Sequence, residues 1–165
     1  MERRNPIAFV KLPAVCAAAA LSLVSFTSSA DTTSPFLGTW VLNVAKSTFD
    51  PPPPLKSNVI TVTQAPGGGV HTVLEIVEAD GTSLHVEYTT TLDGKAVPVT
   101  GYPSADSVRV TKVSARTFKD ALLKDGKVVE RGTFTVSKDG KTMRGPLSGT
   151  EGGVHWKYHY VFDRQ

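Results

Sequence analysis

The sequence predicts an all-β protein, an antiparallel up-and-down meander β-barrel of about eight to ten strands. Four Asp-Gly pairs divide it, at residues 80–81, 93–94, 125–126 and 139–140. Both central residues of a type I′ hairpin turn need positive φ, which Asp and Gly tolerate best. The runs between the pairs are rich in valine, threonine, leucine and aromatic residues. Strands joined in chain order by tight turns favour a closed barrel over the alternative, a two-sheet Greek-key sandwich, which needs long crossing connections.

The turns and the runs between them define ten expected strands. Two glycine clusters, 67–69 and 152–153, mark turns in addition to the Asp-Gly pairs. The segment ARTFKDALLKD, 115–125, could compete as a short helix, but hairpin partners on both sides favour a strand. Gly132, inside a strand, predicts a bend or bulge. The expected strands are 37–44, 58–64, 70–78, 82–92, 95–99, 107–113, 116–123, 127–137, 142–150 and 154–162.

Residues 1–30 have the features of a secretory signal peptide. Basic residues in MERRNPIAFVK precede the apolar run LPAVCAAAALSLVSF, and small residues follow, with Ser28 and Ala30 at the −3 and −1 positions of a cut before Asp31. The apolar run is short for a membrane span. We therefore expect one domain, 31–165, in the periplasm or secreted, without a membrane span after cleavage. A retained N-terminal anchor is the alternative.

The composition of residues 31–165 restricts the function classes. Cleavage removes three of the 18 basic residues and one of the 15 acidic residues, which leaves a net charge of +1. A nearly neutral chain without a Lys/Arg run gives no electrostatic reason to expect nucleic acid as a partner. The only cysteine, Cys16, leaves with the signal peptide, so a hydrophobic core without disulfides must hold the domain. We expect a monomer.

Two irregular segments interrupt the strands. The longer, AKSTFDPPPPLKS at 45–57, contains four consecutive prolines, which donate no ladder hydrogen bonds and favour a polyproline II conformation. We interpret it as a stiff loop between the first two strands, with a ligand for SH3-like modules as the alternative. The shorter, TGYPSADS, is expected at one end of the barrel.

The last strand, VHWKYHYVF, places an aromatic residue at every second position. Because strand residues alternate between faces, Trp156, Tyr158 and Tyr160 share one face with Phe162, and the intervening residues share the other. The aromatic face is expected to point inward, toward a ligand cavity or into a barrel filled by side chains. The tyrosine hydroxyls favour a cavity, since a buried hydroxyl needs a partner.

Both ends of the chain resemble the calycin group, the lipocalins and fatty-acid-binding proteins. The opening FLGTWVLNVAKSTFD carries the Gly-x-Trp of that group at Gly38 and Trp40, and YHYVFDR is similar to the last strand of fatty-acid-binding proteins. The whole of 31–165 resembles small secreted lipocalin-like proteins of bacteria. The resemblance implies that Trp40 closes one end of the barrel and packs against a basic side chain, here Arg164. Gly38, Trp40 and Arg164 are thus expected to be structural.

Two departures from the resemblance bear on the ligand. In fatty-acid-binding proteins an Arg and a Tyr two residues apart hold the ligand carboxylate, whereas this chain has Tyr160 and Phe162 at those positions. An inward-facing Arg109 or Arg131 would compensate for the missing cation. The helical lid of that family is absent too, because the prolines at 51–54 occupy its place. A fatty-acid ligand is therefore less supported than the fold.

Metal and catalytic motifs give no positive indication. His155 and His159 lie about 13 Å apart at about 3.3 Å per residue, too far to chelate one ion. His71 and His85 could face each other across a hairpin, but two imidazoles make an incomplete site. Neither a Gly-x-Ser-x-Gly nor a His-Glu-x-x-His motif is present. We therefore expect no metal, cofactor or catalytic residue.

These observations predict a binding protein for a small apolar or aromatic molecule held in a barrel cavity. One alternative is a filled barrel that acts through its surface, for instance through the 51–54 loop. Another is an isomerase or cyclase, which would need His85, Glu87 or Arg131 inside the barrel. The ligand-binding residues predicted are Tyr88, Phe134, Trp156, Tyr158, Tyr160, Phe162 and Arg131.

Overall fold

The computed structural model describes residues 34–52 and 55–165. The fold below is that of the unit Thr32–Gln165. The predicted signal peptide, residues 1–30, lies outside the described residues. No helix in the described part of the chain is long and apolar enough to cross a membrane.

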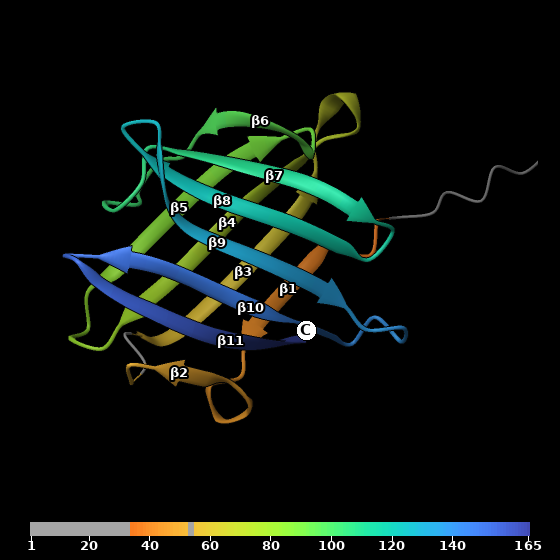
Figure 1. The fold of residues 1–165 in the computed structure, drawn as a ribbon. Helices are drawn as coiled ribbons and strands as arrows, with labels where there is room; N and C mark the ends of the chain where they lie inside the picture. The colour runs from red at the N-terminus through yellow and green to blue at the C-terminus, as the bar shows by residue number, and fades with distance from the viewer. Residues whose placement is uncertain (1–33, 53–54) are drawn as a thin grey trace, which may run out of the picture. The chain divides into compact units, whose positions relative to one another are not determined.

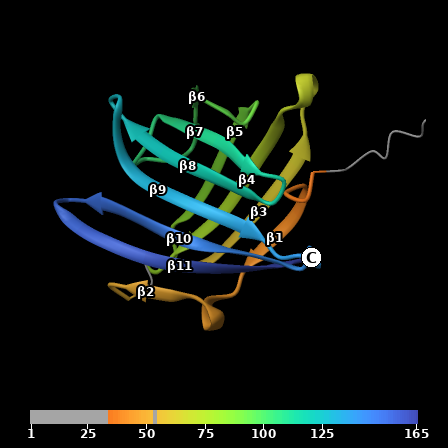
Figure 2. The ribbon, with the colours of Figure 1, turned by 45° about the vertical axis from the view of Figure 1, so that its right-hand side comes forward.

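The described residues form one antiparallel sheet in which strands that follow each other in the chain are mostly neighbours. The order is β5-β4-β3-β1-β11-β10-β9-β8-β7-β6, and β2 pairs with β11 beside this path. The sheet curls so that β7 to β11 cross over β3 to β5 (Figures 1 and 2). The strands are β1 (Gly38–Leu42), β2 (Thr48–Asp50), β3 (Leu55–Gln64), β4 (Val70–Glu78), β5 (Ser83–Thr90), β6 (Asp93–Pro98), β7 (Ser107–Ser114), β8 (Thr117–Lys124), β9 (Lys127–Val136), β10 (Thr142–Glu151) and β11 (Val154–Arg164).

The barrel is nearly closed by a short contact between its two edges. Glu87 of β5 and Thr100, just after β6, exchange two backbone hydrogen bonds of 3.1 and 3.0 Å. Gly101 follows with φ +75°, and a Cβ there would lie 1.8 Å from the carbonyl oxygen of His85. Only glycine permits so close an approach of two backbones. The predicted all-β meander barrel is therefore confirmed, and its closure depends on this glycine.

All ten expected strands are present, and segment 117–124 is a strand rather than a helix. The structure has one strand more than we placed. β2 lies inside 45–57, which we interpreted as a loop, and it pairs with the stretch of β11 beyond the end of β1. Three residues are too few for a recognisable alternation. The free edge of β11 explains why they nevertheless form a strand.

The Asp-Gly pairs mark turns, but only one has the backbone that we predicted. At 125–126 both residues have positive φ, 51° and 74°, as a type I′ turn requires. At 80–81 and 139–140 only the glycine does, and the aspartate accepts the backbone N–H two residues further on. At 93–94 the pair begins β6 after Leu92, which has φ 60°. Side-chain hydrogen bonding of Asp thus replaces the type I′ geometry at two of the turns.

Candidate functional site

A cavity of about 450 Å³ occupies the interior of the barrel. Alternate residues of the strands point into it, because side chains of a strand alternate between the two faces of the sheet. Its apolar and aromatic lining includes Phe36, Ile60, Leu74, Val86, Tyr88, Val108, Phe118, Leu122, Phe134, Leu147, Trp156, Tyr158, Tyr160 and Phe162. The barrel is therefore not filled by its own side chains.

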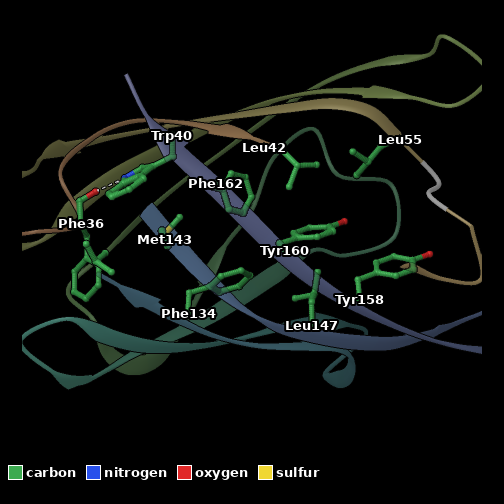
Figure 3. Packing of buried hydrophobic residues seen from close by; sticks show 11 residues of the cluster. Phe36, Trp40, Leu42, Leu55, Phe134, Met143, Leu147, Tyr158, Tyr160 and Phe162 are labelled. Carbon is green, nitrogen blue, oxygen red and sulfur yellow. Dashed lines mark hydrogen bonds between the residues drawn. The ribbon is translucent and has the colours of Figure 1, made fainter. Parts of the chain in front are cut away.

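One end of the barrel is closed by Trp40. The indole is fully buried, its Nε1–H donates a 2.9 Å hydrogen bond to the carbonyl oxygen of Phe36, and the Arg164 guanidinium lies 4.2 Å from the ring centroid. Figure 3 shows Trp40 and Phe36 at one end of the buried cluster and Tyr158 and Leu55 at the other. The contact between Trp40 and Arg164 is the one that the calycin resemblance implied.

Arg164 also fastens the chain segments around this end. Its guanidinium donates to the carbonyl oxygens of Gly140 and Leu37, both at 2.6 Å, and to that of Pro35. Gly38 has φ +120°, and a Cβ there would lie 2.7 Å from Nη1 of Arg164. The glycine of Gly-x-Trp therefore leaves room for the arginine that covers the tryptophan.

The inner face of β11 forms an aromatic wall along the cavity. Trp156 stacks on Tyr158 with ring centroids 4.7 Å apart, and Tyr158 stacks on Tyr160 at 5.9 Å. Phe162 meets Tyr160 edge to face at 5.8 Å. The three rings are nearly parallel, and Trp156, half-buried, lies at the end of the wall away from Trp40.

Phe49 of β2 supports this wall and was missed by the sequence reasoning. Its ring lies 5.4 Å from Tyr158 and 5.8 Å from Tyr160, measured between centroids. It shares the inner face because it is the register partner of Tyr158. The strand to which it belongs was not predicted, so nothing in the sequence assigned Phe49 a face.

Six of the seven predicted ligand-binding residues line the cavity: Tyr88, Phe134, Trp156, Tyr158, Tyr160 and Phe162. The seventh, Arg131, is exposed and does not line it, and Arg109 is exposed as well. The expectation that one of these arginines faces inward is wrong. Phe134 and Arg131 are three residues apart, so a continuous strand puts them on opposite faces. The structure therefore provides no substitute for the missing carboxylate clamp.

Acidic side chains line the cavity instead. Asp120 of β8 lies between Phe118 and Leu122 on the inner face, and Glu130 and Glu78 also contribute to the lining. Asp120 lies opposite Gly132, at which a Cβ would come within 2.2 Å of Oδ1. Gly132, which we expected to mark a bend, thus makes room for a carboxylate. In the sequence, Asp120 is two residues away from both Phe118 and Leu122. This alternation was the pattern that could have assigned its side chain to the interior.

One of the two carboxyl oxygens of Asp120 lacks a hydrogen-bond partner. Its Oδ1 is inaccessible and makes no hydrogen bond. Burial raises the pKa of Asp120 to about 6, although the backbone N–H groups of Asp120 and Gly132 oppose the shift. Burial, and then the charge of Asp120, raises the pKa of Tyr88, while burial and then Glu130 raise that of Tyr160. At neutral pH the cavity thus holds protonated Tyr88 and Tyr160 beside the carboxylate of Asp120.

The histidines do not form the pair that we considered. The register places His71 opposite Thr89 and His85 opposite Glu75. His71 Nδ1 lies 3.0 Å from the Thr89 hydroxyl, and His85 Nδ1 lies 2.6 Å from a Glu75 carboxylate oxygen. Among the described residues, no three His, Cys, Asp or Glu side chains are grouped as metal ligands would be.

Comparison with solved structures identifies the fold. No protein-family model and no curated protein sequence matches this chain. A mutant of the fluorescent protein UnaG is similar over 79% of this chain and 96% of its own, with 14% identity and a TM-score of 0.50. The zebrafish ileal bile acid-binding protein complexed with cholic acid covers 80% of this chain and 100% of its own, with 8% identity and a TM-score of 0.46.

A redesigned β-barrel, mFAP1 bound to DFHBI, has 11% identity and a TM-score of 0.46, and covers 79% of this chain and 95% of its own. At such low identities a likeness concerns the fold alone. The barrel described above, with its Trp40 plug and meander order, is a calycin-like fold, as the resemblance implied.

Proposed function

We propose that this protein binds a small apolar or aromatic molecule in the barrel cavity. The observation that carries the proposal is the cavity itself, about 450 Å³ enclosed by an aromatic wall. Ligand pockets in proteins have volumes of about 300–1,000 Å³ and are mostly apolar, with a few polar groups. A barrel with a structural role alone would gain stability by filling this space, because empty volume costs packing energy.

The ligand enters at the end opposite Trp40. There the cavity is lined by Glu78 at the end of β4, by Thr82 in the following turn and by half-buried Trp156 at the start of β11. Burial of ~300 Å² of ligand surface at ~25 cal/mol per Å² gives about 7.5 kcal/mol. The costs of association leave an affinity near micromolar.

We propose further that the protein is exported and works as a monomer in the periplasm or outside the cell. The charged, apolar and small-residue segments of 1–30 support export. The net charge of +1 for residues 31–165 supports neither nucleic acid nor an anionic membrane as partner.

Neither alternative function gains an observation of its own. The residues that an isomerase or cyclase would need, His85, Glu87 and Arg131, do not line the cavity. A filled-barrel module is not favoured, because the cavity is present.

Native mass spectrometry tests the proposal. The full-length chain is expressed in a Gram-negative host, purified without detergent, and its N-terminus is determined. We expect a mass that begins at Asp31, with an added mass that disappears on denaturation and is lost in a folded Tyr158→Ala/Tyr160→Ala variant. A matched Lys157→Ala/His159→Ala variant, which changes two exposed residues on the outer face of the same strand, should keep the adduct. Only bare protein, together with no tryptophan-emission change for any aromatic probe, would contradict ligand binding, and an intact N-terminus would contradict export.

A further inference from the structure

The charges inside the cavity are of one sign. Glu78, Asp120 and Glu130 line it, and its described lining contains no Lys, Arg or His. The ion pairs Lys46–Asp163, His71–Glu87, His85–Glu75 and Lys95–Asp93 leave Glu78 and Asp120 out. A ligand that enters this cavity therefore meets the negative charge of Asp120, whereas a carboxylate ligand would need a cation.

Asp120 is the carboxylate of this cavity that has no basic side chain beside it among the lining residues described. It lies on the inner face of β8, its Oδ1 is inaccessible and without a hydrogen bond, and Gly132 opposite leaves the space that it occupies. Enclosing an unpaired carboxylate is costly, so buried carboxylates are normally paired with a cation or fully hydrogen-bonded. The carboxylate of Glu130 has a hydrogen-bond partner, because the hydroxyl of Tyr102 donates to its Oε2 at 3.4 Å.

A second unsatisfied acceptor faces the same cavity from another strand. Asn58 of β3 is 4% exposed, lines the cavity, and its Oδ1 makes no hydrogen bond. Like Oδ1 of Asp120, this amide oxygen is inaccessible, so it makes this part of the wall polar and electron-rich without itself contacting a ligand.

We propose that the cavity selects a cationic ligand, an organic amine with an apolar or aromatic body, and that Asp120 pairs with its ammonium group. This inference rests on the proposed function, because it specifies the chemistry of the same site. A charge-assisted hydrogen bond inside the enclosed cavity compensates Asp120, and the body of the ligand packs against the wall of β11. A carboxylate ligand of the same shape is repelled.

Binding of such a ligand depends on pH through Asp120. The titratable groups that face the cavity are Glu78, Tyr88, Tyr102, Glu130, Tyr158 and Tyr160. Burial raises the pKa of Tyr88 and of Tyr160 above the ordinary tyrosine value, whereas it raises the pKa of Asp120 to about 6, within the range of interest. Affinity for an amine should fall as pH drops through 6, since the protonated acid no longer carries the charge.

Calorimetric titration with a matched series tests the proposal. The protein is purified after expression of the full-length chain and titrated at pH 7.5 with 1-naphthylmethylamine, 1-naphthylmethanol and 1-naphthoate. We expect the amine to bind at least about tenfold more tightly than the alcohol, and the carboxylate most weakly. Asp120→Asn should bring the amine-to-alcohol ratio close to one. The control Asp125→Asn, which removes the same charge in the exposed turn after β8, should leave the ratio unchanged.

The outcomes separate this inference from the proposed function. If the alcohol or the carboxylate binds as tightly as the amine, ligand binding stands and the selection of a cation is overturned. If none of the three binds, this inference is overturned, and the native mass measurement decides whether the proposed function fails as well. Should Asp120→Asn not fold, the pH dependence of the unmodified protein serves instead. Amine affinity that does not fall between pH 7.5 and 5 contradicts the assignment of Asp120.

Discussion

The closed end of the barrel and the cavity each contain a charged side chain, Arg164 and Asp120, but the two differ in how many hydrogen bonds they make. Arg164 lies 4.2 Å from the Trp40 ring and donates to three carbonyl oxygens. Asp120 also lies among aromatic rings, but its Oδ1 has no donor. A satisfied charge stabilises the fold, whereas an unsatisfied one costs stability and is compensated only by something that enters. The comparison separates a structural end from a ligand-binding interior.

The largest expected effect comes from removing the plug. Trp40→Ala deletes a fully buried indole and should lower the free energy of unfolding by about 3–5 kcal/mol. Trp156→Ala, at the half-buried mouth, is the matched control and should cost less than half as much. Urea titration of the two variants measures both values. Equal losses would show that the two ends do not differ as we describe.

Arg164 should contribute nearly as much to the closed end. Arg164→Ala removes three donors and the cation above Trp40, and we expect a loss of about 2–3 kcal/mol in urea titration. Arg164→Lys keeps the charge without the planar fork and should recover less than half of the loss. Full recovery by lysine would mean that the charge, and not the three hydrogen bonds, fastens this end.

Substitution of Asp120 should raise the stability of the ligand-free protein, whereas substitution of Trp40 or Arg164 lowers it. Asp120→Asn removes an enclosed charge that has no basic side chain beside it among the described lining residues, so the variant without ligand should be more stable at pH 7, by about 1–2 kcal/mol. The thermal midpoint of the ligand-free variant against that of Asp125→Asn checks this. A destabilised variant would indicate that the carboxylate is satisfied in the folded protein.

The pH dependence of stability tests the same carboxyl group. The pKa of Asp120 is about 6 in the folded protein and about 3.9 in an unfolded chain. Between these values the folded protein binds more protons, so stability from this group falls as pH rises from about 4 to 6 and is then constant. The difference in urea midpoint between Asp120→Asn and the unmodified protein should therefore grow across this window. A constant difference would contradict the raised pKa.

Local pattern was enough to predict the strands, because Asp-Gly turns and period-two alternation are properties of short segments. Local pattern also assigned the inner face of β11, because Trp156, Tyr158 and Tyr160 alternate with polar residues and so only one set of positions can face inward. In β8 the phase was ambiguous, since Phe118 and Leu122 favour one face and Ala121 and Leu123 the other. A register shift between Leu122 and Leu123 lets residues of both phases be buried. Such a bulge depends on the partner strand.

The sequence by itself determined the all-β meander, the aromatic wall and the residues of the plug, since each depends on neighbours along the chain or on the calycin resemblance. Only the tertiary structure decided that the barrel encloses a cavity, that β2 completes the edge of β11, and that Arg131 faces out while Asp120 faces in. These features depend on register between strands and on the volume left after packing. Both arise from contacts between residues far apart in the chain, which no local pattern contains.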